Sequence, residues 1–183
     1  MKRKKILFFP CCFLLLFFMI FRIWCINRTY PEPNVKKYTQ GETVKTKGFE
    51  ITLDNWKFYS QTESEQILKN NHIDDTIPNA QKKMFCTQLS IKNIENGVNF
   101  IDITDFSFES LAWHNQWDME LFYVLNDITT MTIELEPGEI CNITLPIILY
   151  DFQFKPHIWD DINQRTFYLV ISFYPVKRVF TNC

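Results

Sequence analysis

The sequence predicts a mainly β protein, in which an antiparallel β-sandwich follows one N-terminal transmembrane helix. Roughly seven or eight short segments alternate apolar and polar residues and are separated by turn residues, as the strands of a sandwich are. After the first apolar run, no segment has the length of a helix that connects parallel strands. The chain contains 18 Phe and 4 Gly residues, and aromatic and β-branched side chains favour strands over helices.

Three segments follow one another in the predicted organisation. Residues 1–26 are a cytoplasmic basic flank and transmembrane signal anchor, residues 27–47 an extended stalk and first edge segment, and residues 48–183 an extracytoplasmic β-sandwich. Lys2-Arg-Lys-Lys5 precedes an apolar run from Ile6 to Phe21. The excess of positive charge ahead of the run places the N-terminus in the cytoplasm. This predicts a single-pass protein of the cell membrane with its C-terminal domain outside.

The apolar run is expected to stay attached. A cleaved signal peptide needs small residues before the cut, yet the first alanine is Ala80 and bulky residues follow Phe21. Lipidation at Cys25 is a weaker alternative, because Arg22-Ile-Trp24 is large and charged where small residues are expected. Pro31 and Pro33 keep the following segment extended, as in a stalk.

Gly48 opens the first strand of the predicted sandwich. Phe49, Ile51 and Leu53 share one face, and the apolar phase then moves to Trp56 and Phe58. A shift of one residue predicts a bulge or turn at Asp54-Asn55. A polar stretch follows, in which Thr62-Glu-Ser-Glu65 has the spacing of a capping box and predicts a short surface helix and a loop.

The remaining elements follow in order, with strands expected over Met84–Ile94, Asp105–Trp113, Trp117–Leu125, Met131–Leu135, Cys141–Leu149, Thr166–Tyr174 and Val176–Thr181. Trp117–Leu125 also fits a helical stripe, but we interpret it as a strand. The strands on either side of Glu136-Pro-Gly-Glu139 should pair antiparallel, because that turn suits a hairpin. Thr166–Tyr174 is apolar on both faces, which is typical of a central strand. Pro156–Ile162 predicts a single helical turn.

Charge and cysteine content exclude some classes of protein. The formal net charge is −2 and the external part has no basic patch, so nucleic acid is not an expected partner. Three cysteines lie outside the predicted anchor, at Cys86, Cys141 and Cys183. One disulfide is an option, but free, core-facing thiols explain the pattern equally well, and Cys141 alternates with apolar residues.

Two clusters combine histidine with carboxylates, and together they are the candidate metal ligands His72, Asp74, Asp75, His157, Asp160 and Asp161. Imidazole with carboxylates can bind zinc, and the carboxylates alone can bind calcium. A polar loop and a short capped helix explain the same residues, and we favour that interpretation because the spacing specifies no complete ligand set. No cofactor is predicted.

Trp113, His114 and Trp117 form the candidate ligand-binding segment. Aromatic faces and amides in a loop are suited to sugars or peptides. The alternative, that both tryptophans close the end of the core, is favoured because large aromatic side chains are mostly buried. No Gly-rich phosphate loop, Gly-x-Ser-x-Gly elbow or His-Glu-x-x-His motif occurs, so an enzyme is not expected.

Four segments carry a resemblance: Phe49-Glu-Ile-Thr-Leu53, Leu89-Ser-Ile-Lys-Asn-Ile94, Leu135-Glu-Pro-Gly-Glu139 and Phe167-Tyr-Leu-Val-Ile-Ser172. With the anchor and stalk, they resemble the exported, membrane-anchored immunoglobulin-like (telokin-like) domains of unknown function of Gram-positive bacteria, over about Val35 to Phe180. The resemblance implies an immunoglobulin-like sandwich and transfers no catalytic residue. Many such domains are lipoproteins, and the sequence around Cys25 departs from that pattern.

Three hypotheses for the function follow. The first is a non-enzymatic, membrane-anchored module that binds a protein, peptide or envelope component through loops or an exposed sheet edge. The second is a metal- or ligand-binding, enzyme-like domain that uses the clusters around His72 and His157. The third is a structural spacer or subunit of an envelope complex.

Overall fold

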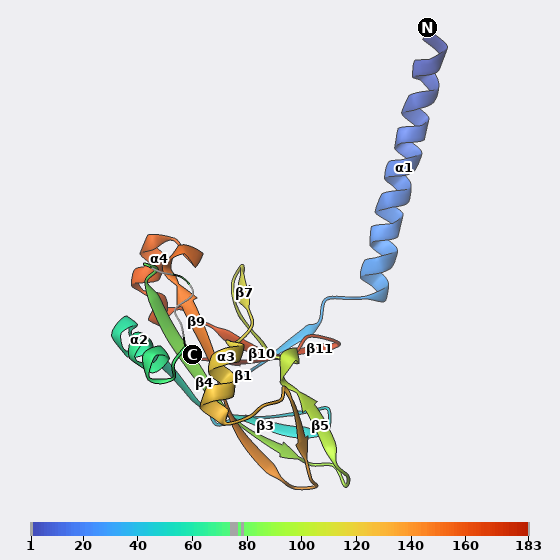
Figure 1. Cartoon of the computed structure of the whole chain (residues 1–183). Coiled ribbons are helices and arrows are strands. Elements are labelled where there is room, and N and C mark those ends of the chain that lie inside the picture. Colours follow the sequence, from blue (N-terminus) through green and yellow to red (C-terminus); the bar gives the residue numbers. More distant parts are fainter. Residues whose placement is uncertain (1, 74–76, 78, 183) are drawn as a thin grey trace. The chain divides into compact units, whose positions relative to one another are not determined.

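The computed structural model describes residues 2–73, 77 and 79–182, which divide into two compact units, Met1–Asn34 and Val35–Cys183. The first unit is dominated by one long helix, α1, from Lys2 to Thr29 (Figure 1). Its segment Cys12–Thr29 has the length and apolar composition needed to cross a membrane. The predicted N-terminal apolar helix is therefore confirmed, and it continues slightly beyond residue 26.

The second unit is mainly β and contains three sheets. Antiparallel pairing joins β10 to β11 and β6, β6 to β7, β3 to β2 and β4, β4 to β9, and β5 to β8. A five-stranded sheet has the order β1 (Asn34–Tyr38), β11 (Val176–Thr181), β10 (Tyr168–Ser172), β6 (Ser107–Ser110), β7 (Trp113–Asn115). A four-stranded sheet has the order β2 (Thr43–Thr46), β3 (Phe49–Tyr59), β4 (Lys82–Asn93), β9 (Ile140–Tyr150). The smallest sheet pairs β5 (Asn99–Asp102) with β8 (Thr132–Leu135).

Short helices connect the strands. They are α2 (Gln61–Asn70), η1 (Ile103–Asp105), α3 (Met119–Asn126), η2 (Asp151–Gln153), α4 (Pro156–Asp160) and η3 (Ile162–Gln164). The longest of them has 10 residues, too few for the crossover of a parallel sheet. The predicted helical turn over 156–162 is confirmed by α4 and η3.

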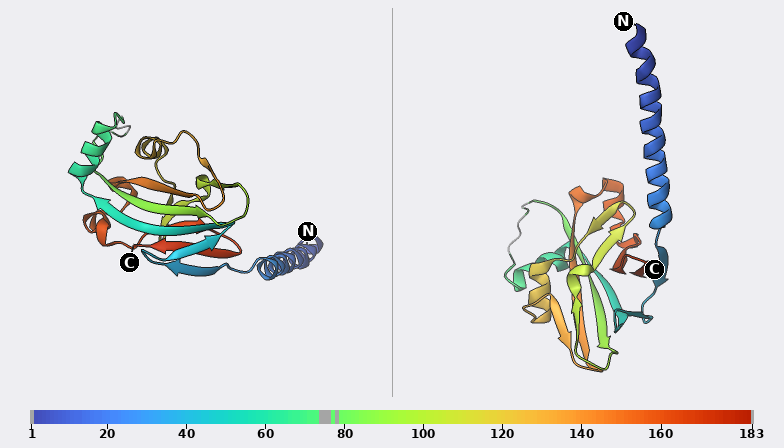
Figure 2. Two further views of the ribbon diagram at one scale, coloured as in Figure 1. Left: turned by 90° about the horizontal axis from the view of Figure 1, so that it is seen from below. Right: turned by 90° about the vertical axis from the view of Figure 1, so that its right-hand side faces the viewer.

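The core lies between the two large sheets, whose strands form separate layers in the left view of Figure 2. Leu53, Leu89 and Leu145 of the four-stranded sheet are fully buried in one cluster with Phe108 and Leu169 of the five-stranded sheet. Burial of apolar side chains from both inner faces is the main stabilising term of a sandwich. The predicted antiparallel β-sandwich is confirmed.

Strand β3 shows the predicted irregularity. Phe49, Ile51 and Leu53 are buried on one face, and the pairing with β4 shifts between Leu53 and Asn55. Asp54 is the extra residue of this bulge. The inserted residue turns the next apolar side chain, Trp56, toward the core side of the strand.

Helix α2 was predicted, but its cap lies two residues earlier than expected. Ser60, and not Thr62, is the N-cap, and Glu63 completes the capping box. The backbone N–H and the hydroxyl of Ser60 donate to Glu63 Oε2 at 2.8 and 2.7 Å. These hydrogen bonds hold the pKa of Glu63 below its ordinary value of 4.5. Two pairs of residues have the spacing of a capping box, Ser60 with Glu63 and Thr62 with Glu65. Because β3 ends at Tyr59, the helix can begin directly after it, with Ser60 as its cap.

The change Ser60→Ala should lower the free energy of unfolding by about 1 kcal/mol, because the cap bond to the Glu63 N–H is lost. Thr62→Ala, at an exposed position inside the helix, should change it by less than about 0.5 kcal/mol. The measurement is urea denaturation at neutral pH. Because the pKa of Glu63 is lower in the folded state, its ionised carboxylate stabilises the fold at pH values above the ordinary pKa of 4.5. This contribution is lost as the pH falls through the pKa of the folded state. The difference between wild type and Ser60→Ala should therefore shrink in acid. Equal effects of the two changes would contradict the assignment.

Most of the segment Trp117–Leu125, predicted as a strand, lies in helix α3, which begins at Met119. Asp118 caps it, since its carboxylate accepts the Leu121 N–H at 2.9 Å. Leu121 and Phe122 are buried on one face of the helix. The helical stripe in this segment was therefore the informative pattern, and the two-residue alternation was accidental. Asp105–Trp113, also predicted as one strand, is divided among the end of η1, β6 and the start of β7.

The prediction that the strands on either side of Glu136-Pro-Gly-Glu139 form a hairpin is wrong, although both strands exist. Strand β8 pairs with β5, and β9 pairs with β4 along all of its 11 residues. The turn leads the chain from one sheet to the other. Asn93, at the end of β4, binds the turn through its backbone: Gly138 N donates to Asn93 O, and Asn93 N donates to Glu139 O, each at 3.0 Å. A tight turn permits a hairpin but does not require one, and the long ladder with β4 outweighs the short alternative.

The end of the chain follows the prediction. Strand β10 lies at the centre of the five-stranded sheet, and Leu169, Val170 and Ile171 are buried on both of its faces. Pro175 separates it from β11. Cys86 and Cys141 are free thiols, and Cys183 lies outside the described residues. Burial raises the pKa of the Cys86 thiol to about 12.

Candidate ligand-binding site

Trp117 belongs to the core. It is 7% exposed, and its indole Nε1 donates to the backbone oxygen of Ile103 at 3.1 Å. Its ring packs against Phe122 with 4.7 Å between ring centroids. Both the ring and the indole N–H are thus used inside the domain, which agrees with the interpretation that this tryptophan closes the core.

Trp113 is half-buried and also packs inward. Its ring meets Phe167 edge-on at 5.5 Å and lies 5.8 Å from Phe154. His114, between the two tryptophans in sequence, is different: it is exposed, and its Nε2 lies 3.1 Å from the hydroxyl oxygen of the buried Ser107. Strand alternation explains the division, since neighbouring residues of β7 face opposite sides.

His114 lines an open pocket of about 370 Å³. The pocket lies where β10 ends and β6 begins, and the turn before β3 adds one wall. Its lining residues are Lys47, Thr104, Asp105, Ser107, His114, Gln116, Ile171, Ser172, Phe173 and Tyr174. A volume of this size is within the range of sites for small ligands or for side chains of a peptide.

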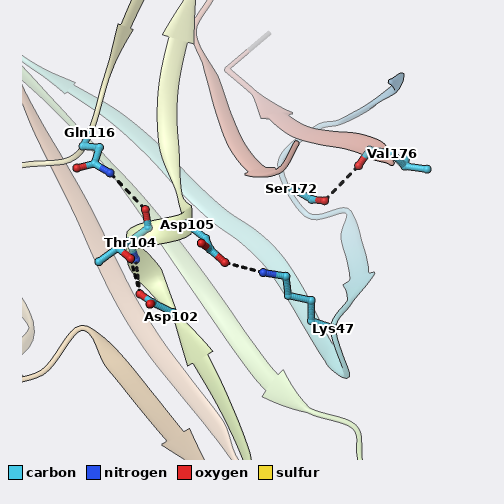
Figure 3. A network of polar contacts seen from close by, with 7 residues as sticks. All are labelled: Lys47, Asp102, Thr104, Asp105, Gln116, Ser172 and Val176. Atoms are coloured by element: carbon cyan, nitrogen blue, oxygen red, sulfur yellow. Dashed lines mark hydrogen bonds and ion pairs between the residues drawn. The ribbon is translucent and has the colours of Figure 1, made fainter. Parts of the chain in front are cut away.

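Hydrogen bonds fix the polar part of the pocket (Figure 3). Lys47, in the turn before β3, and Asp105, in η1, form an ion pair. Both side chains are more than half exposed, so the pair positions the wall more than it stabilises the fold. Asp102 accepts two hydrogen bonds from Thr104, at 2.9 and 2.6 Å, which lower the pKa of its carboxyl group. Gln116 Nε2 donates to the Thr104 backbone oxygen at 3.3 Å.

Two aromatic side chains form the apolar part. Phe173 and Tyr174 follow β10 and are 48% and 53% exposed. Ser172 below them is held by a hydrogen bond from its hydroxyl to the Val176 backbone oxygen at 3.2 Å, which closes the turn. Exposed rings beside fixed polar groups can receive an apolar side chain and hydrogen-bond the backbone next to it.

The candidate metal ligands are not brought together among the residues that the structure describes. In residues 2–73, 77 and 79–182, no group of three His, Cys, Asp or Glu side chains is placed to hold a metal ion. His72 follows α2 with a φ of 57°, and His157 and Asp160 lie on the exposed face of α4. The Asp161 carboxylate accepts from Gln164 Nε2 at 3.4 Å. Asp74 and Asp75 lie outside the described residues, so the predicted cluster that contains them stays a prediction.

Sequence reasoning missed Phe173 and Tyr174, which it assigned to the central strand. The signal was present in Pro175, because a proline that ends a strand places the residues before it in a turn. No feature of the sequence marked the lining residues Lys47, Thr104 and Asp105, because the tertiary structure alone brings the turn before β3 next to η1.

A family profile described as "Domain of unknown function (DUF5028)" matches residues 35–178. The chain belongs to the DUF5028 family. The matched segment covers almost all of the second compact unit, Val35–Cys183, so this unit is the DUF5028 domain. The resemblance to domains of unknown function is confirmed to that extent. A comparison with curated proteins found no match.

Solved structures similar to the DUF5028 protein include three bacterial proteins. An uncharacterized β-sandwich protein of Clostridium difficile 630 is 16% identical, with a TM-score of 0.47, and the match covers 83% of this chain and 97% of that one. The yjhA protein of Bacillus subtilis is 12% identical, with a TM-score of 0.46 and coverage of 76% and 84%. A conserved hypothetical protein of Bacillus anthracis is 12% identical, with a TM-score of 0.48 and coverage of 78% and 94%.

Proposed function

We propose that this DUF5028 protein is a membrane-anchored, extracytoplasmic and non-catalytic binding module, and that its ligand is a peptide segment of a partner protein. The pocket beside β10 carries the proposal, because two exposed aromatic rings, Phe173 and Tyr174, lie next to hydrogen-bonding groups that are already fixed. A bound segment would insert an apolar side chain between the rings, and Gln116 and His114 would face its backbone. Preorganised polar groups reduce the entropy lost on binding.

The structure favours this pocket over the long edge of the four-stranded sheet. Outward-facing backbone groups at the centre of β9 are already used: Asn126 receives the Thr144 N–H at 2.6 Å and donates to the Thr144 oxygen at 2.9 Å. Asp118 N donates to Pro146 O at 2.8 Å, and Pro146 has no N–H. An edge blocked in this way cannot accept an added strand at its centre.

The anchor supports the location. Helix α1 is apolar enough to cross a bilayer, and four basic residues, Lys2 to Lys5, precede its apolar run. In intact cells that carry the protein, externally added protease should remove the domain after Asn27, and the isolated mature chain should still contain residues 6–26. Protection of the domain, or a mature chain that starts beyond Ile26, would refute the anchored, outward-facing arrangement.

Photo-crosslinking tests the pocket. p-Benzoylphenylalanine at position 173 in the full chain, irradiated on intact cells, should capture a discrete protein. The matched control is position 152, where the native Phe is 64% exposed and lies outside the pocket. Tyr174→Ala should weaken that capture about tenfold, because it removes one of the two rings that would hold the apolar side chain. The same capture from both positions, or none from position 173, would contradict a peptide-binding pocket there.

A further inference from the structure

The connection between the apolar helix and the β domain is short. Helix α1 ends at Thr29 and strand β1 begins at Asn34, so only the four residues Tyr30-Pro-Glu-Pro33 join them. Pro31 and Pro33 favour an extended conformation of this segment. Even a fully extended chain spans at most about 18 Å from Thr29 to Asn34. The start of β1 is therefore held within that distance of the end of the apolar helix, whatever angle the helix makes with the domain.

Strand β1 runs in the same direction as its neighbour β11. The two strands are adjacent in the five-stranded sheet, and the rings of Tyr38 and Phe180 lie 6.0 Å apart. The residues that follow these two along the chain also lie together, because Gln40 and Asn182 line the same pocket. Both strands thus end on the same side of the sheet. It follows that the start of β1 lies beside the start of β11.

The pocket beside Phe173 and Tyr174 lies at this same end of the sheet. Both residues belong to the turn between Ser172, where β10 ends, and Val176, where β11 starts. Neighbouring strands are about 4.8 Å apart, and Tyr174 precedes β11 by only two residues, so the turn lies roughly 10 Å from the start of β1. The pocket is therefore within roughly 30 Å of the end of α1.

A layer of this depth restricts what can occupy the pocket of the anchored protein proposed above. About 30 Å is the diameter of one small folded domain, so a second folded domain has little room between the pocket and the bilayer. An extended segment that leaves the bilayer covers the same distance in about ten residues. A protein that spans the same membrane keeps such a segment inside this layer permanently, which raises the effective concentration of the segment at the pocket.

We propose that the pocket binds the juxtamembrane segment of an integral membrane protein in the same bilayer. This proposal rests on the proposed function, because it needs both the anchored helix and the peptide site beside Phe173. It adds the class of the partner: a protein with a span of its own that presents an apolar side chain within about ten residues of that span. A secreted protein or a component of the envelope beyond this layer is the competing occupant.

Spacers of two kinds test the reach of the pocket. About 20 prolines inserted between Pro33 and Asn34 of the full chain form a stiff rod of about 60 Å, whereas the same number of alternating Gly and Ser residues forms a flexible coil whose ends lie about 25 Å apart on average. Photo-crosslinking from p-benzoylphenylalanine at position 173, on intact cells, should fall at least about tenfold with the rod. It should fall only about threefold with the coil, because the coil lets the domain return to the bilayer.

A protease site inside the flexible spacer shows whether the captured partner has its own span. After irradiation, cutting the spacer in isolated membranes should release the uncaptured domain into the supernatant. The crosslinked product should stay in the membrane, held by its partner. Both spacers lie before Val35–Cys183, and an unchanged urea midpoint of the domain excludes an effect on folding.

The outcomes separate this proposal from the proposed function. Equal capture with the native connection and with the rod, or release of the crosslinked product by the protease, would overturn the juxtamembrane partner and leave the peptide-binding pocket standing. Absence of capture with the native connection would refute the peptide-binding pocket itself, and this proposal with it.

Discussion

Replacing Asn93 by alanine should lower the free energy of unfolding of the domain by about 3 kcal/mol, the largest effect expected for a polar residue here. Asn93 is fully buried. Its Nδ2 donates to the backbone oxygens of Gly97 at 2.8 Å and Leu135 at 2.9 Å, and its Oδ1 accepts the Glu95 N–H at 2.9 Å. All three partners are backbone groups that lose a hydrogen bond, and the bond to Leu135 O is buried.

The effect of Asn93 is large because it lies where two sheets separate. Its backbone receives the turn that leads into β9, while its side chain holds the end of β8. Urea denaturation of the full chain in micelles, followed by tryptophan fluorescence, measures the change. The control is Asn96→Ala, an exposed residue of the same turn, which should change stability by less than about 0.5 kcal/mol. If Asn93→Ala behaves like this control, the buried amide does not join the sheets.

Phe85→Ala should lower the free energy of unfolding by about 4 kcal/mol, within the range measured for a buried phenylalanine. Phe85 is fully buried on β4. Its ring centroid lies 5.1 and 5.0 Å from those of Trp56 and Phe58 on β3, and 5.0 and 4.9 Å from those of Phe108 and Phe167 in the facing layer. One substitution therefore removes aromatic contacts within one sheet and between the sheets, and leaves a cavity that four rigid rings cannot easily fill.

Phe152→Ala is the matched control for Phe85→Ala, because the Phe152 side chain is 64% exposed and contacts only the ring of Tyr150 among the aromatic pairs described, at 5.4 Å. It should cost less than about 1 kcal/mol. Both variants are compared by the urea midpoint at constant denaturant slope. A loss below about 2 kcal/mol for Phe85→Ala would mean that the layers can close over the missing ring.

Local patterns predicted many elements of this fold, because each reports a contact with the nearest neighbours along the chain. The phase shift after Leu53 predicted the bulge at Asp54, and the doubly apolar segment around Val170 predicted the central position of β10. Prediction from the spacing of apolar residues failed where the same residues fitted both the period of a strand and the period of a helix, as in α3. There the Asp118 cap and the burial of Leu121 and Phe122 decided in favour of the helix.

The candidate sites were less accessible to prediction, since each combines segments that are distant in the chain. His114 was expected to contact a ligand and does line a pocket, but Trp113 and Trp117 pack inward. A pocket that is lined by Gln40, Trp56, Asn163 and Thr181 joins the ends of β1 and β11 to β3 and η3. The unpaired indole N–H of Trp56 could not be found by any motif, because the sequence does not show which tryptophan lacks an acceptor.

The sequence by itself determined that this protein has an apolar N-terminal helix and a helix-poor, strand-rich domain, because composition and alternation act over a few residues. Only the tertiary structure decided which strands pair. Strands β8 and β9 lie on either side of a turn suited to a hairpin and still join different sheets. The physical reason is that pairing depends on the whole ladder, and β9 pairs with β4 along 11 residues, whereas β8 has only 4 residues to offer.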